Sequence, residues 1–232
     1  FGYGEKLIGK VLSHSKIHDT IIVASKVGRL REGKKWITNG RPEYIKHACE
    51  ESLRRLKQET IALYQLHQVD QKVPIEESMG AFKDLQDNGK IQHIGLSNVD
   101  QTQIDPILAE GRIESIQNCL NPLFKRDLRN EMISFCEEKK LTYIAYSPFG
   151  GFYSKNQSDN SVLAKIAQSK KCTTYDVAFS WISKTSKRIV PIPASINGER
   201  VKAWIQALDI ELSEDEIKEI NAIEDHSHPY AS

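Results

Sequence analysis

The stretch that most constrains the fold is Ile61–Leu66, an apolar run of residues that favour strands, free of Pro and Gly. It is too apolar for a strand with one face in water, so it predicts a strand buried on both faces. Such strands belong to parallel sheets covered by helices, whose active sites lie at the carboxyl ends of the strands. His67 follows this strand directly, and Ser25 and Lys26 follow a second predicted strand, Thr20–Ala24. Lys26 and His67 are therefore candidates for one shared site.

Hydrophobic periodicity predicts strands and helices in alternation along the chain. Pro42 fits the first position of a helix, Gly89 fits a helix carboxyl cap, and Ser213 forms a capping box with Glu216. The polar segment Gly28–Arg41 is predicted to be a loop. Strands are predicted at 20–24, 61–66, 91–96, 113–117, 141–146 and 189–192, and helices at 5–13, 42–56, 75–88, 101–108, 130–139, 162–169, 174–184, 198–207 and 213–223.

Six predicted strands, each followed by a helix, indicate an α/β protein with a parallel sheet, either open and doubly wound or closed into a barrel. An open sheet of this kind usually has a turn of the form G-x-G-x-x-G after its first strand, and this sequence has none. The pattern therefore favours a parallel (β/α)8 TIM-type barrel, which needs eight strands. We expect residues 1–232 to be a single barrel domain that is incomplete at the N-terminus, with the first βαβ portion upstream of Phe1.

The composition is that of a globular protein, with 39% hydrophobic residues and a net charge of +1. This balance gives no electrostatic reason to expect a nucleic acid or an anionic membrane as a partner. No apolar stretch reaches the roughly 18 residues of a membrane span and no signal-peptide pattern is present, so a cytoplasmic protein is expected. The four cysteines, Cys49, Cys119, Cys136 and Cys172, lie far apart, which predicts reduced structural thiols and no metal site.

Polar or aromatic groups end the predicted strands, and in a barrel these ends converge on one face. Each has a plain structural explanation: Lys26 as a solvated strand end, His67 as a satisfied structural histidine, and Asn98 or Asn118 as a turn former. The whole set carries more weight than any of its members. It consists of Lys26, His67, Ser97, Asn98, Gln117, Tyr146, Ser147 and the segment 194–197.

Six segments in this order resemble the aldo-keto reductases over essentially the whole chain: IIVASKVG, IALYQLHQVD, GKIQHIGLSNVD, SIQNCLNP, IAYSPFGG and IVPIPASINGERV. The resemblance implies a TIM-type barrel that binds a nicotinamide cofactor in extended form, NADPH being favoured and NADH possible. It also implies hydride transfer between the nicotinamide and the carbonyl of a small aldehyde or ketone, or the reverse oxidation of an alcohol. A monomer or a weak homo-oligomer is expected.

The resemblance assigns Lys26 and His67 to a catalytic tetrad of Asp, Tyr, Lys and His. Lys26 matches the lysine whose ammonium lowers the pKa of the tyrosine that acts as general acid. His67 matches the histidine that orients the carbonyl and shares its proton. As hydride arrives, negative charge builds on the carbonyl oxygen and needs a placed donor.

The acid and the aspartate of this tetrad are expected upstream of Phe1. Glu5 and Gly9 match the helix that follows the tyrosine in the family, but Tyr3 stands closer to Gly9 than the family's usual spacing. Tyr3 is therefore either an alternative acid or a loop aromatic near the mouth of the site.

The resemblance also implies three groups of cofactor-binding residues. One group orients the nicotinamide ring, one meets the pyrophosphate through a glycine loop, and one holds the adenosine end. In that order they are Ser97, Asn98, Gln117 and Tyr146; Ser147, Pro148, Gly150 and Gly151; and Ser195, Asn197 and Arg200. Arg200 could pair with a 2′-phosphate, which favours NADPH, while Ala194 stands where a basic residue is common, which leaves NADH open.

Three alternatives of function stay open at this point. They are a dehydrogenase that oxidises alcohols, a nicotinamide-binding regulatory subunit with little turnover, such as a potassium-channel-associated subunit, and a truncated, inactive barrel. The loops expected to wall the substrate pocket are 30–39, 68–73 and 149–153. Trp36 in the first loop is either an aromatic wall of that pocket or an exposed structural residue.

Overall fold

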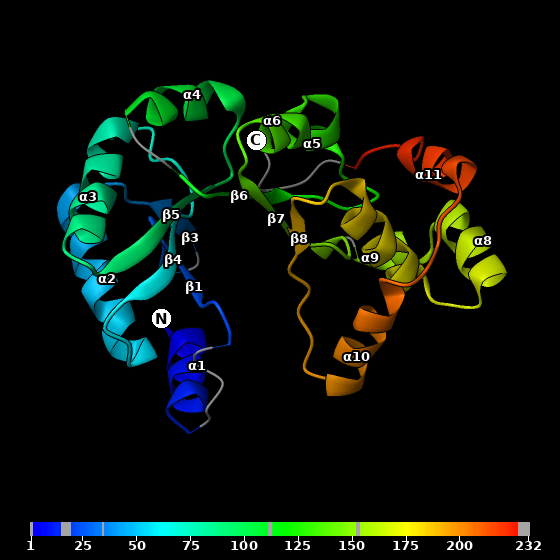
Figure 1. The fold of residues 1–232 in the computed structure, drawn as a ribbon, viewed down its shortest axis with the longest axis horizontal. Helices are drawn as coiled ribbons and strands as arrows, with labels where there is room; N and C mark the ends of the chain where they lie inside the picture. Colours follow the sequence, from blue (N-terminus) through cyan, green and yellow to red (C-terminus); the bar gives the residue numbers. More distant parts are fainter. Residues whose placement is uncertain (1, 15–19, 34, 111–112, 152–153, 227–232) are drawn as a thin grey trace. The chain divides into compact units, whose positions relative to one another are not determined.

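The computed structural model describes residues 2–14, 20–33, 35–110, 113–151 and 154–226 (Figure 1). The chain forms two compact units, Phe1–Ser115 and Ile116–Ser232, called unit 1 and unit 2 below. The prediction of a single barrel domain that continues upstream of Phe1 stays a prediction.

Unit 1 alternates helices and strands in the predicted order, with a hairpin inserted after its first strand. Its elements are α1 (Tyr3–His14), β1 (Ala24–Val27), β2 (Arg29–Glu32), β3 (Lys35–Thr38), α2 (Pro42–Leu56), β4 (Ile61–Leu66), α3 (Ile75–Asp87), β5 (Ile91–Ser97) and α4 (Gln101–Glu110). Among the described residues, unit 2 contains fewer strands and more helices than unit 1. Its elements are α5 (Arg126–Arg129), α6 (Met132–Glu138), β7 (Thr142–Tyr146), α7 (Ser154–Ser158), α8 (Ser161–Lys170), α9 (Thr174–Thr185), β8 (Ile189–Pro191), α10 (Gly198–Ala207) and α11 (Glu214–Asn221), and β6 (Ser115–Cys119) begins at the last residue of unit 1.

The strands form one six-stranded sheet in the order β1-β4-β5-β6-β7-β8, which confirms the six predicted strands and the α/β class. The pairs β1–β4, β4–β5 and β7–β8 are parallel. In unit 1, α2 and α3 lie side by side over the sheet (Figure 1). The ring of Phe82 on α3 packs 5.5 Å from that of Tyr64 on β4, and both side chains are fully buried. Through this contact α3 covers one face of β4, in agreement with the strand covered by helices that the apolar run Ile61–Leu66 predicts.

The first strand is displaced from its prediction. β1 spans Ala24–Val27 instead of Thr20–Ala24, so Lys26 lies inside the strand and not after it. The reason is register: Ala24 pairs with Leu63 and Val27 with Leu66, where β4 offers partners. Ile22, which looks like strand interior in the sequence, is 81% exposed.

The predicted loop Gly28–Arg41 contains the antiparallel hairpin β2–β3, which is a second correction. Its two strands have alternating polar and apolar residues, such as Leu30 opposite Ile37, but each is only four residues long. Runs this short give little periodic signal. The same reason explains why the short helices α5 and α7 are missing from the prediction.

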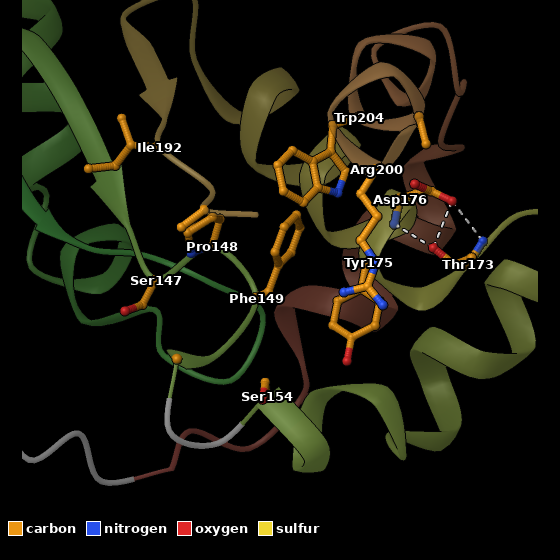
Figure 2. Close-up of a pocket in the computed structure, with 13 residues that line it drawn as sticks. Ser147, Pro148, Phe149, Ser154, Thr173, Tyr175, Asp176, Ile192, Arg200 and Trp204 are labelled. Atoms are coloured by element: carbon orange, nitrogen blue, oxygen red, sulfur yellow. Dashed lines mark hydrogen bonds between the residues drawn. The ribbon is translucent and has the colours of Figure 1, made fainter. Parts of the chain in front are cut away.

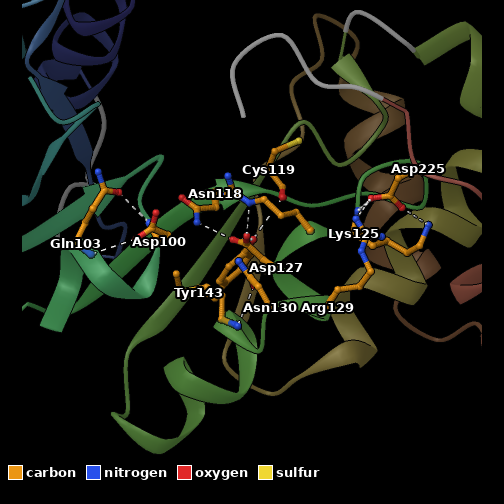
Figure 3. A network of polar contacts seen from close by, with 12 residues as sticks. Asp100, Gln103, Asn118, Cys119, Lys125, Asp127, Arg129, Asn130, Tyr143 and Asp225 are labelled. Atoms are coloured by element: carbon orange, nitrogen blue, oxygen red, sulfur yellow. Dashed lines mark hydrogen bonds and ion pairs between the residues drawn. The ribbon is translucent and has the colours of Figure 1, made fainter. Parts of the chain in front are cut away.

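A buried carboxylate anchors the strands of unit 2 (Figure 3). Asp127 on α5 is fully buried and accepts hydrogen bonds from Asn118 Nδ2 at 2.6 Å and from the Tyr143 hydroxyl at 3.0 Å. Arg126 Nε lies 2.9 Å from the other oxygen of Asp127 and balances its charge. Asn118 therefore has a structural role, as a buried polar group paired within the fold.

The chain beyond α11 is fastened to unit 2 by Lys125 (Figure 3). This lysine is 3% exposed, and its ammonium donates to the carbonyls of Pro122 and Ile223 and lies 2.9 Å from Asp225 Oδ1. Arg129 donates to the second oxygen of Asp225 at 2.6 Å. A buried lysine that meets three acceptors holds this segment tightly.

Close packing inside unit 1 depends on Gly95 of β5. A Cβ at this position would lie 2.3 Å from Ser115 Oγ and 2.9 Å from Gln65 Cγ. Gln65 is itself fully buried and donates from Nε2 to Ser115 Oγ at 3.4 Å. A side chain at Gly95 would thus displace the buried pair of Gln65 and Ser115.

We expect Gly95→Ala to lower the free energy of unfolding by about 1–3 kcal/mol, the usual cost of overpacking a core. The matched control is Gly80→Ala on α3, where a new Cβ has no neighbour within 4 Å. That change should raise stability by about 0.5–1 kcal/mol, because alanine favours a helix interior. Urea unfolding measures both values, and an unchanged midpoint for Gly95→Ala would contradict the packing described for β5.

Candidate active site

Unit 1 brings Lys26, next to the last residue of β1, near His67, which directly follows the neighbouring strand β4. In the parallel pairing of β1 with β4, Lys26 lies opposite Gln65. The backbone N–H of His67 then donates to the Val27 carbonyl at 2.7 Å, which extends the ladder one step past β4. Both side chains are half-buried.

Burial and nearby positive charge keep the imidazole of His67 neutral. Its pKa falls from 6.5 to about 4, first through burial and then through the charges of Lys26 and Arg29. Burial also lowers the pKa of the Lys26 ammonium. A neutral imidazole beside an ammonium can orient a polar group or share its proton at neutral pH.

Asn98, which directly follows β5, contacts the main chain of His67 through its side chain. Its Nδ2 donates to the His67 carbonyl at 3.0 Å and to Ser97 Oγ at 3.1 Å. Asn98 has φ of 56°, so the chain turns sharply after β5 in a conformation that costs energy for most residues. Ser97 is buried at the end of β5. The predicted residues Ser97 and Asn98 therefore lie beside the main chain of His67, and their roles toward a cofactor stay predictions.

The helix match at Glu5 and Gly9 has a structural explanation in unit 1. Glu5 accepts hydrogen bonds from the Ser25 hydroxyl at 2.5 Å and from Arg55 Nε at 2.6 Å. Burial alone would raise the pKa of Glu5, but these hydrogen bonds outweigh it and the pKa falls. Tyr3, the alternative acid, is 79% exposed at the start of α1, and its role is untested.

Unit 2 contains a cavity of about 670 Å³ (Figure 2). Four predicted cofactor-binding residues line it: Ser147, Pro148, Gly151 and Arg200. The lining also includes Phe149, Ser154, Thr173, Tyr175, Asp176, Ile192, Ala194, Ala203 and Trp204. The residues predicted at the end of β7, in the glycine loop and in the adenosine-binding segment thus supply part of the cavity lining.

The loop after β7 is built from left-handed residues. Ser147, Gly150 and Gly151 have φ values of 52°, 81° and 55°. A Cβ at Gly151 would come within 2.9 Å of Ser147 Oγ, so only glycine lets the loop fold this closely against the cavity. The N–H of Gly150 donates to the Ser147 carbonyl at 3.0 Å and closes the turn.

The remaining predicted residues of unit 2 are not among the residues that line the cavity. Gln117 is buried in β6, and Tyr146 is half-buried at the end of β7. The Ser195 hydroxyl bonds the Asn197 backbone, and the Asn197 side chain accepts from the N–H of Glu199 at 2.9 Å as the cap of α10. Asn197 therefore sets the start of the helix that carries Arg200.

An aromatic wall is the part of the cavity that sequence reasoning missed. The ring of Phe149 lies 5.3 Å from that of Tyr175 on α9 and 5.1 Å from that of Trp204 on α10. Arg200 extends from α10 toward Tyr175 (Figure 2). Three separate segments supply these rings, and only the helical spacing of Arg200 and Trp204 on one helix could have linked two of the lining residues.

Other site types find little support in the described parts of the chain. Outside the gaps at 1, 15–19, 34, 111–112, 152–153 and 227–232, no cluster of three His, Cys, Asp or Glu side chains could hold a metal ion. The helices that can be described are all too short or too polar to cross a membrane. The four cysteines are free, and burial raises the pKa of Cys49 and Cys136 to about 12. Of the predicted pocket loops, residues 34, 152 and 153 lie outside the described residues.

Comparison with known proteins gives consistent matches. The model of the aldo/keto reductase family matches residues 1–225. A probable aldo-keto reductase from Glycine max is 30% identical over 244 aligned residues, which cover 93% of this chain and 70% of that protein. The crystal structure of a thermostable aldo-keto reductase with the inhibitor epalrestat superposes with a TM-score of 0.84 at 25% identity, covering 95% of this chain and 77% of that one. An aldo-keto reductase from Klebsiella pneumoniae crystallised with NADPH has a TM-score of 0.80 at 24% identity, covering 95% and 75%.

We expect NMR titration to give His67 a pKa of about 4 in the folded protein, well below the ordinary 6.5. Since the unfolded chain then binds this proton at a higher pH, the group lowers stability as the pH falls from 6.5 towards 4. Lys26→Met should raise the pKa of His67 by removing one of the two charges, whereas Lys83→Met, exposed on α3, should leave it unchanged. A pKa at or above 6.5 in the unaltered protein would contradict this electrostatic environment.

Proposed function

Because the family model spans residues 1–225, the chain belongs to the aldo/keto reductase family, and on this premise we propose an NADPH-dependent reductase of small aldehydes or ketones. The observation that carries the proposal is that Lys26 on β1 lies near a neutral His67, which directly follows the neighbouring strand β4. The reverse reaction, oxidation of an alcohol, uses the same groups.

His67 would orient the substrate carbonyl. A neutral imidazole can donate one N–H to the carbonyl oxygen without carrying a charge into the half-buried site. Negative charge develops on this oxygen during reduction, so a donor that is already in place lowers the barrier. The hydrogen bonds of His67 to Val27 and from Asn98 fix the backbone that carries this imidazole.

Lys26 would act through electrostatics. Its half-buried ammonium stabilises negative charge on a nearby phenolate, which lowers the pKa of the tyrosine that donates the proton. Tyr3 at the start of α1 is the candidate for this tyrosine among the described residues. Partial burial strengthens the effect of the Lys26 charge, because water screens it less.

The cavity of unit 2 fits the phosphate-bearing part of a dinucleotide. It combines the guanidinium of Arg200, a loop of left-handed residues at 147–151 and an aromatic wall. Arg200 would pair with a 2′-phosphate, which favours NADPH, and Ser195 and Asn197 would hold the adenosine end. Pro148, Gly150 and Gly151 would meet the pyrophosphate.

In unit 1, Ser97 and Asn98 would orient the nicotinamide. In unit 2, Gln117 keeps its predicted role toward the carboxamide, and Tyr146 keeps its predicted role toward the ring. Bound NADPH supplies the hydride for the reduction. The structure with NADPH from Klebsiella pneumoniae supports this cofactor through the shared fold. For the present chain, the polar residues at the ends of β5 and β6 supply amide and hydroxyl groups suited to a carboxamide.

We expect the intact protein to bind NADPH and to reduce a small aldehyde such as benzaldehyde. Lys26→Met should lower kcat by about 10²- to 10⁴-fold, the usual contribution of acid–base assistance, and should leave NADPH affinity unchanged. Fluorescence titration measures binding, and NADPH absorbance measures turnover. Lys83→Met is the control for the loss of a lysine charge, because Lys83 pairs with Asp87 on the exposed face of α3.

Unchanged turnover in Lys26→Met would contradict the catalytic role assigned to Lys26. Binding of NADPH without turnover in the unaltered protein would favour the regulatory subunit over the reductase. Failure to bind either NADPH or NADH would overturn the cofactor-binding assignments as well.

A further inference from the structure

We propose that Asn121 and Gln157 are positioning residues for the cofactor, because their buried carboxamides hold the loop at 147–151 in the shape that receives the pyrophosphate. The inference rests on the proposed function and adds two residues that act through the loop. Both lie in unit 2, as do the loop and the cavity that it lines.

The loop needs to be held, because its first residue is strained. Ser147 has φ of 52°, a left-handed conformation that residues with a Cβ rarely adopt. Such conformations persist where the surroundings fix them, and they gather at ligand sites. The Ser147 carbonyl accepts two hydrogen bonds, from the Gly150 N–H at 3.0 Å and from Asn121 Nδ2 at 3.0 Å. The second comes from outside the loop and holds the strained residue in place.

Asn121 is itself rigidly placed. The Leu120 N–H donates to the Tyr146 carbonyl at 3.3 Å, which brings the chain after β6 alongside the start of the loop. The main chain of Asn121 exchanges two hydrogen bonds with Phe124, and its Oδ1 accepts from the Leu123 N–H at 3.0 Å. The side chain is 1% exposed. This turn uses only the Oδ1 of Asn121, so the Nδ2 donor that meets the loop has no part in it.

Gln157 on α7 meets the next carbonyl of the loop. Its Nε2 donates to the Pro148 carbonyl at 3.4 Å, and its side chain is fully buried. Its Oε1 is buried as well and has no hydrogen-bond partner among the described residues. An unpaired buried oxygen costs stability, so an apolar side chain would fill the same space more favourably. Holding the loop explains why a carboxamide stands at this position.

The two carboxamides occupy carbonyls of the loop and leave its N–H groups for an anion. Phe149 and Gly151 line the cavity, and their N–H groups meet no acceptor in the part of the chain that the structure describes. Backbone N–H groups of a tight loop commonly bind phosphate. Arg200 supplies a cation to the same cavity (Figure 2), and the carboxylate of Asp176 is occupied by the N–H and hydroxyl of Thr173. These surroundings suit a pyrophosphate.

The test measures the affinity of the intact protein for three ligands by calorimetry. NADPH and ADP-ribose contain a pyrophosphate, and adenosine 2′-phosphate does not. Asn121→Ser keeps an oxygen for the turn and removes the amide donor, and Gln157→Leu keeps the bulk and removes the amide. Each change should weaken NADPH and ADP-ribose by about 3- to 10-fold, the size of one neutral hydrogen bond, and leave adenosine 2′-phosphate unchanged.

Asn118→Ser is the matched control, because Asn118 is an equally buried asparagine whose Nδ2 donates to Asp127 and not to the loop. It should lower the free energy of unfolding and leave all three affinities unchanged. Hydrogen exchange tests the loop without a ligand. The Gly150 N–H should exchange about 3- to 10-fold faster in Asn121→Ser, because the carbonyl that accepts it is no longer held from outside.

Unchanged affinity for ADP-ribose in both variants would overturn the inference. An equal loss for adenosine 2′-phosphate would do the same, since it would show general damage to unit 2. If the unaltered protein binds no NADPH, the proposed function fails, and inorganic pyrophosphate then replaces the three ligands. Absence of pyrophosphate binding, or equal affinity for pyrophosphate in Asn121→Ser, would in that case overturn the inference.

Discussion

The parallel pairing of β1 with β4 is the constraint on which the candidate active site depends. It sets Lys26 beside β4, and the hydrogen bond from the His67 N–H to the Val27 carbonyl carries the pairing past the end of the strand. Asn98 holds the His67 carbonyl from the next strand. With its main chain fixed on both sides, the imidazole stays half-buried beside an ammonium, and these surroundings keep it neutral. Two contacts thus fix the main chain that carries this side chain, and burial and nearby charges set its protonation.

The parts of the fold that can be predicted are those that the local sequence determines. The strand Ile61–Leu66 has the predicted bounds, because a buried run next to a histidine needs no distant information. The first strand was misplaced since Ile22 is as apolar as a buried residue, and only the register with β4 shows that pairing starts at Ala24. The cavity wall of Phe149, Tyr175 and Trp204 joins three distant segments, so no local pattern indicates it. Tertiary contacts decide such features.

Positive charge is distributed unevenly over a chain whose net charge is only +1. In unit 1, Lys26 and Arg29 both lower the pKa of His67. In unit 2, Arg200 lines the cavity beside a loop that glycine allows to fold closely. Elsewhere on the described surface, lysines form ion pairs with acidic side chains, such as Lys46–Asp84 and Lys165–Glu219. Local concentration of cations suits a reaction in which a phosphate-bearing cofactor binds and an oxygen gains negative charge.

The central claim is the proposal that Ser97 and Asn98 of unit 1 fix the nicotinamide so that one face meets a carbonyl oriented by His67. The most direct measurement uses NADPH that carries deuterium at one of its two C4 positions, with mass analysis of the alcohol formed. A fixed ring transfers deuterium from one labelled cofactor and none from its epimer. Transfer of deuterium from both epimers would show that the nicotinamide ring binds with either face toward the substrate, and would contradict the claim.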